Sequence, residues 1–92
     1  MKGIDSYNWE DLYNKANEFI NTYIPVATVN TGCKSFIGGV PRVQISFIAK
    51  GNRQYIKLLD EMKCMRKLKG MNGKDGRIIQ AEIIFNVDGS IN

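Results

Sequence analysis

The feature that most constrains the fold is a stripe of apolar residues with helical spacing near the start of the chain. Its members recur at intervals of three and four residues, which places them on one face of an α-helix. Asn8 is a good N-cap, and Pro25 ends the pattern, so the sequence predicts a helix over residues 8 to 23. The stripe consists of Trp9, Leu12, Tyr13, Ala16, Phe19, Ile20 and Tyr23.

Beyond Pro25 the apolar period shortens to the two-residue alternation that is typical of strands. Three strands are predicted here, over residues 26 to 29, 33 to 37 and 42 to 50. Asn30-Thr31-Gly32 indicates a turn between the first two, and Gly38-Gly39 indicates a hairpin turn before the third. Pro41 favours either an edge position for the third strand, where a partner could add a further strand, or a strand that begins there.

A second helix is predicted after Gly51-Asn52, ending at Gly70. Its inward stripe consists of Tyr55, Leu58, Leu59, Met62 and Met65. Residues 70 to 76 hold three glycines and predict a flexible loop, and a last strand follows over residues 79 to 87. The order α-β-β-β-α-β predicts one small α+β domain over residues 1 to 92, with a mainly antiparallel sheet and both helices packed on one face.

Composition argues against catalysis and metal binding. The chain contains no histidine, the commonest general base and a frequent metal ligand. Two cysteines are too few for a disulfide scaffold or a cysteine-based zinc site. Asp60 and Glu61 are adjacent on the second predicted helix and therefore face different directions. We expect no enzyme activity, no catalytic residues, no metal and no cofactor.

The two cysteines leave alternatives open. The second predicted helix would turn Cys64 outward between Lys57 and Lys67, and nearby positive charge lowers the pKa of a thiol and makes it reactive. Without a histidine, however, no base completes a nucleophilic pair. Cys33 and Cys64 are expected to be reduced, and a disulfide between them remains an alternative.

Positive charge gathers in one window of the chain, residues 62 to 77. The whole chain has a net charge of +4, and the six basic residues of this window face a single acid, Asp75. They are Lys63, Arg66, Lys67, Lys69, Lys74 and Arg77. Basic side chains and loop amides both donate to phosphate oxygens, which suggests binding of nucleic acid or another polyanion. The alternative is a solvated surface that complements the negative end of the helix.

A second candidate site is the sheet face that the helices leave open. Outward positions of the predicted strands combine isoleucines with uncharged polar residues, a composition that suits a protein interface or a homodimer. The candidate interface residues are Gln44, Ile48, Ile78 and Ile84. The alternative is that isolated apolar residues on an open sheet have no binding role.

These features favour a non-catalytic binding module. Isoleucine, asparagine and lysine make up 30 of the 92 residues, a bias that AT-rich codons produce. We therefore expect a small accessory or inhibitor protein of the phage or mobile-element type, acting on a protein target that includes nucleic-acid-handling complexes. The alternative is direct RNA or DNA binding through residues 62 to 77.

No apolar run approaches the roughly 20 residues of a bilayer span, and no signal segment is visible, so no membrane contact and a cytoplasmic location are expected.

Overall fold

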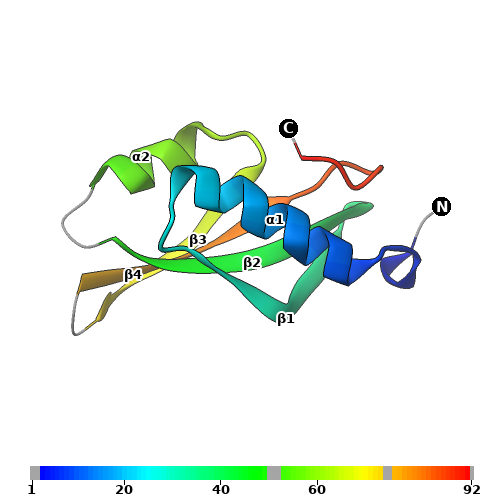
Figure 1. The fold of residues 1–92 in the computed structure, drawn as a ribbon, viewed down its shortest axis with the longest axis horizontal. Helices are drawn as coiled ribbons and strands as arrows, with labels where there is room; N and C mark the ends of the chain where they lie inside the picture. The colour runs from blue at the N-terminus through cyan, green and yellow to red at the C-terminus, as the bar shows by residue number, and fades with distance from the viewer. Residues whose placement is uncertain (1–2, 50–52, 74–75, 92) are drawn as a thin grey trace.

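The computed structural model describes residues 3–49, 53–73 and 76–91, and within them two α-helices lie on one face of a four-stranded antiparallel sheet (Figure 1). The elements in chain order are a short 3-10 helix η1 (Ile4–Ser6), α1 (Trp9–Tyr23), β1 (Thr28–Ile37), β2 (Val40–Ala49), α2 (Arg53–Glu61), β3 (Met65–Gly73) and β4 (Gly76–Ile84). The α+β class, the antiparallel sheet and the packing of both helices on one face are confirmed.

Helix α1 forms where its apolar stripe predicts. The Asn8 side chain accepts a hydrogen bond from the Asp11 backbone N–H at 3.2 Å, which caps the first turn. At the other end the Ile24 N–H donates to the carbonyl of Ile20 at 2.7 Å, and Pro25 follows. The buried face of the helix consists of Trp9, Leu12, Ala16 and Ile20.

Strand β1 is one bulged strand where the sequence predicted two strands and a turn. Val29 is opposite Ile45 and Lys34 is opposite Val43, so five steps along β1 match two steps along β2. The extra residues form a bulge, which turn-forming residues tolerate without ending the strand. The predicted turn at Gly38-Gly39 is confirmed: both glycines have positive φ, 64° and 80°, as a tight hairpin turn requires.

The second helix is shorter than predicted, because α2 ends at Glu61 and residues from Met65 onward form strand β3. Met, Arg, Lys and Leu are good helix formers, but this preference is small and tertiary pairing overrides it. Strand β3 pairs with β4 from Met65 opposite Ile83 to Gly73 opposite Gly76. The flexible loop predicted over residues 70 to 76 is therefore wrong for residues 70 to 73, and residues 74 and 75 lie outside the described residues. The observed order is α-β-β-α-β-β.

The sheet order β1-β2-β4-β3 makes β2 and β4 central strands and β1 and β3 edge strands. The edge position predicted for the strand after Pro41 is wrong, because β2 pairs with β1 on one side and with β4 on the other. Pro41 is tolerated at the second residue of β2, where its carbonyl accepts a hydrogen bond from the Phe85 N–H at 2.9 Å.

The core lies between the helices and the inner face of β2 and β4. Alternate residues of these strands are buried, as the two-residue period requires. The fully buried side chains of this layer include Val43, Ile45, Ile79, Ile83, Phe85, Ile20 and Leu59. The opposite residues of the same strands form the outer face of the sheet, which neither helix covers (Figure 1).

Candidate protein-binding face

The outer face of the sheet, called the open face below, consists of the side chains that point away from both helices. Strand register places the four predicted interface residues together on it, because Gln44 is opposite Glu82, Ile48 is opposite Ile78, and Arg42 is opposite Ile84. These pairs alternate along β2 and β4 with the buried pairs. Because successive side chains of a strand point to opposite faces, all of these pairs lie on the side away from the helices.

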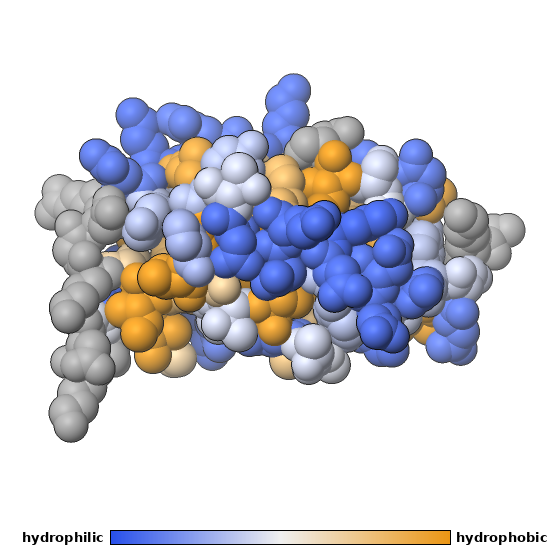
Figure 2. Space-filling model, viewed as in Figure 1, coloured by the Kyte–Doolittle hydropathy of each residue, from blue (hydrophilic) through white to orange (hydrophobic). Residues whose placement is uncertain are grey.

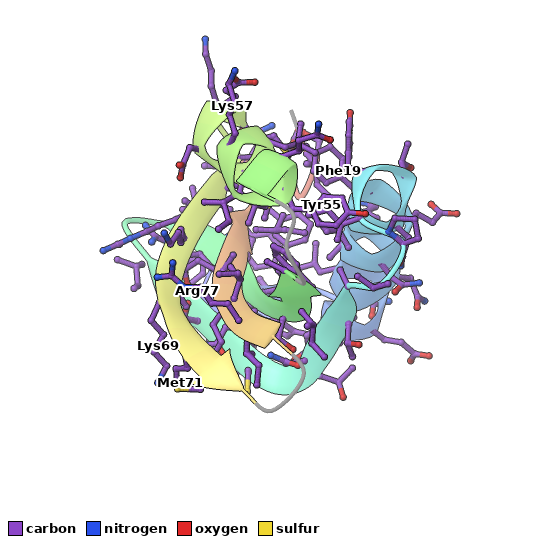
Figure 3. All side chains as sticks on the ribbon, turned by 90° about the vertical axis from the view of Figure 1, so that its left-hand side faces the viewer. Phe19, Tyr55, Lys57, Lys69, Met71 and Arg77 are labelled. Atoms are coloured by element: carbon purple, nitrogen blue, oxygen red, sulfur yellow. The ribbon has the colours of Figure 1, made fainter. Side chains whose placement is uncertain are left out.

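An apolar row crosses three strands at one end of the open face. Ile48 of β2 is opposite Ile78 of β4, which is opposite Met71 of β3. The side chains of Ile48 and Met71 remain 45% and 43% exposed. Figure 3 shows Met71 on the outer side of β3 beside Lys69. Sequence reasoning missed Met71, because it assigned residues 70 to 76 to a loop. Gly70, Asn72 and Gly73 favour a loop, so the local sequence carried no signal for a strand there.

The middle of the open face holds an ion pair. The Arg42 Nη1 donates to the Glu82 Oε1 at 3.0 Å, and the two side chains are only 14% and 9% exposed. Arg66 of β3 is opposite Glu82 on its other side. The Arg42 Nε is buried and has no hydrogen-bond partner within the described residues. The ion pair between Arg42 and Glu82 therefore links β2 to β4.

The open face has no aromatic side chain among its described residues. The chain contains nine aromatic residues, one Trp, four Tyr and four Phe. They lie on the helices, in the core or, for Tyr7 and Phe36, in ring contact with each other at the end of α1. Proteins that bind single-stranded nucleic acid on a sheet stack bases on aromatic side chains, and this face offers none.

The predicted basic cluster does not converge on one surface. Arg66 and Lys69 belong to the open face, because they are opposite Glu82 and Gln80. Lys67 is opposite the buried Ala81, and Arg77, opposite Ala49, lies with its guanidinium against Gly70 on the helix side. Lys63 is in the turn before β3. Lys74 lies outside the described residues.

The glycine segment does not form the predicted phosphate cradle over the residues described. Gly70 pairs with Ile79 and Met71 pairs with Ile78, so this backbone runs as an extended strand beside β4. An anion-binding concavity needs successive N–H groups that converge, which requires a turn or helix-like backbone. Polyanion binding through residues 62 to 77 would therefore depend on the basic side chains alone, without backbone N–H groups.

The cysteines differ from the prediction. Cys64 is buried in the turn before β3, not exposed on a helix, and burial raises the pKa of its thiol above the ordinary value. The thiol therefore stays protonated at neutral pH, and the predicted outward position of Cys64 is wrong. Cys33 is exposed on the bulge of β1, and both thiols are free.

The helix side of the molecule is mostly polar. Figure 2 shows hydrophilic residues over α1, with apolar residues gathered near the end of the sheet where β3 and β4 connect. Along α1 an open hollow of about 450 Å³ is lined by Lys15, Glu18, Phe19, Thr22, Ser90 and Ile91. Its two charged groups are of opposite sign, and Lys15 is already paired with Asp11 at 3.2 Å.

Residues 3–49, 53–73 and 76–91 hold no group of three or more His, Cys, Asp or Glu side chains placed to bind a metal ion. Within the same ranges, no helix has both the length and the apolar character needed to cross a membrane. The chain matches no protein-family model, no curated protein and no solved structure. The geometry of the open face is therefore the ground for inferring a function.

Proposed function

We propose that the protein is a non-catalytic binding module that contacts a partner protein through its open face. The observation that carries this proposal is the apolar row of Ile48, Ile78 and Met71, joined across three strands on a face that neither helix covers. Burying roughly 200 Å² of such side chains contributes about 5 kcal/mol before the costs of association. A polar surround of Gln44, Ser46 and Gln80 completes the usual anatomy of an interface.

A protein partner fits this surface better than a nucleic acid. The open face has no aromatic platform for bases, and the basic residues are divided between the two sides of the sheet. Nucleic-acid binding by phosphate contacts alone requires several cations on one side. Among the described residues of the open face, Arg42 is already held by Glu82, which leaves Arg66 and Lys69.

The charges of the open face also favour a different protein over a second copy of the chain. Among the open-face residues that the structure describes, Arg42, Arg66 and Lys69 outnumber the single acid Glu82. A two-fold homodimer through this face would bring these like charges together, which costs free energy. A partner with acidic groups around an apolar centre avoids that cost. Together with the composition, this supports an accessory or inhibitor protein of the phage or mobile-element type that acts on a cytoplasmic protein.

The test is affinity capture of the tagged protein from cells of its native host, with nuclease added. We expect a protein to be retained by the unmodified chain and lost with Ile48→Asp/Ile78→Asp, which places charge in the apolar row. Val87→Asp is the matched control, because Val87 is 57% exposed in the segment after β4, beyond the end of the sheet that is opposite the apolar row.

Two results would contradict the proposal. Retention of the same partner by Ile48→Asp/Ile78→Asp, with circular dichroism showing a folded chain, would place the interface elsewhere. Loss of all captured protein upon nuclease treatment would show that nucleic acid mediates the association, in favour of the alternative function.

A further inference from the structure

The two edges of the sheet differ in their ability to accept another strand. At the β1 edge, the bulge between Val29 and Lys34 interrupts the regular strand, and the Gly32 N–H already donates to the Tyr13 hydroxyl at 2.9 Å. At the β3 edge, Lys69 to Gly73 pair residue by residue with β4 and have no strand on their other side among the described residues. Unpaired N–H and C=O groups of such an edge can hydrogen-bond to an extended peptide.

A bulge in β3 places its cations on one face. The register slips by one residue between Lys67 and Lys69, with Leu68 as the additional residue. Without this slip, Arg66 and Lys69, three residues apart, would point to opposite sides of the sheet. With it, Arg66, Lys69 and Met71 line the open-face side of the edge, opposite Glu82, Gln80 and Ile78.

The positive charge of this edge is in excess, because Glu82, the acid opposite Arg66, is already paired with Arg42. Arg66, Lys67 and Lys69 take part in none of the ion pairs formed within residues 3–49, 53–73 and 76–91, and β3 itself contains no acidic residue. Lysines on an edge discourage pairing with a second β3, since like charges would stand opposite one another. The same charges attract an acidic strand.

We propose that the β3 edge accepts an extended acidic segment of a partner protein as a fifth antiparallel or parallel strand. Main-chain hydrogen bonds supply affinity, acidic side chains beside Arg66 and Lys69 supply specificity, and an apolar side chain covers Met71, which is 43% exposed. This inference goes beyond the proposed function, because the partner is bound by main-chain hydrogen bonds along the β3 edge, and only Arg66, Lys69 and Met71 are shared with the open face.

The probe is a capped synthetic peptide of about six residues, the usual length of a strand. Two glutamates and a valine occupy alternate positions, so that all three share the side of Arg66, Lys69 and Met71, with threonines between them. The control peptide has lysine in place of glutamate. In NMR spectra of the full chain, we expect the acidic peptide to slow the hydrogen exchange of β3 amides between Lys69 and Met71 and to leave β1 amides unchanged. Affinity should fall as salt rises, since exposed charges are screened.

Two pairs of charge reversals separate specific from general attraction. Arg66→Glu/Lys69→Glu, which reverses the two cations on the open-face side of the edge, should weaken binding by about tenfold or more, corresponding to about 1.4 kcal/mol. Lys57→Glu/Lys63→Glu makes the same change of charge outside β3 and should leave binding within about twofold. Ile48→Asp/Ile78→Asp should also retain the peptide, which keeps this test independent of the open face.

Three outcomes would overturn the proposal. One is equal binding of the lysine peptide. Another is binding that shifts the methyl signals of Ile48 and Ile78 without protecting β3 amides, which would indicate docking on the open face. The third is absence of binding at millimolar peptide while the unmodified chain remains folded.

Discussion

Replacing Glu82 by leucine should destabilise the protein through its effect on Arg42. The two side chains are 9% and 14% exposed and are joined by a 3.0 Å hydrogen bond at the centre of the open face. In Glu82→Leu the guanidinium of Arg42 keeps its charge, loses its acceptor and stays in a poorly hydrated place. Its Nε already has no partner within the described residues, so no neighbouring acceptor is available there.

The magnitude follows from the burial of the pair. Removing one partner of a fully buried ion pair costs about 3–5 kcal/mol, whereas a fully exposed pair contributes about 1 kcal/mol or less. Arg42 retains some contact with water, so we expect a loss of about 2–3 kcal/mol. The double variant Arg42→Leu/Glu82→Leu removes both charges and should be within about 1 kcal/mol of the unmodified protein.

Urea unfolding followed by the fluorescence of Trp9, which is buried on α1, measures these free energies. Gln44→Leu is the matched control, because Gln44 is an uncharged neighbour opposite Glu82 on the same face. It should change the free energy of unfolding by less than about 0.5 kcal/mol.

The reasoning is refuted if Glu82→Leu costs less than about 0.5 kcal/mol, a value typical of an exposed pair. It is also refuted if the double variant is as unstable as the single one, since the cost would then come from the shape of the leucine and not from a stranded charge.

Three further predictions concern the framework of the molecule. Ile20→Ala should lower the free energy of unfolding by about 2–5 kcal/mol, because Ile20 is fully buried between α1 and the sheet; calorimetry measures it, and a loss below about 1 kcal/mol would contradict the packing. A thiol reagent at pH 8 should modify exposed Cys33 rapidly and Cys64 only after unfolding, because burial raises the Cys64 pKa; mass spectrometry of digested protein distinguishes them, and equal rates would contradict it. Gly38→Ala should cost about 1 kcal/mol in urea unfolding, because φ is +64° there, and an unchanged midpoint would argue against the hairpin turn.

Local patterns in the sequence predict α1, β2 and β4. The stripe from Trp9 onward and the Asn8 cap require only neighbouring residues, and the alternation of β2 and β4 marks which residues face the core. For the same reason the open face is predictable, since Ile48 and Ile78 are out of phase with the buried positions of their own strands.

Strand β3 is not predictable in this way. Residues 65 to 69 favour a helix by their intrinsic propensity. They form a strand because they hydrogen-bond to the edge of β4 that β2 leaves unpaired. That error has two consequences for the candidate site. Met71 is left out of the apolar row, and the cations of residues 62 to 77 appear to be one cluster, although strand alternation sends Arg66 and Lys67 to opposite sides of the sheet.

The most direct test of the open face as an interface is methyl NMR of the protein with and without its captured partner, in the presence of a soluble paramagnetic agent. In the free protein the agent should broaden the methyl signals of Ile48, Ile78 and Met71, which lie on the open face, and spare those of the buried Ile79 and Ile83. In the complex the first three should become protected, while the exposed Val87, in the segment after β4, remains broadened. Unchanged broadening of Ile48, Ile78 and Met71 in the complex would contradict the proposed function.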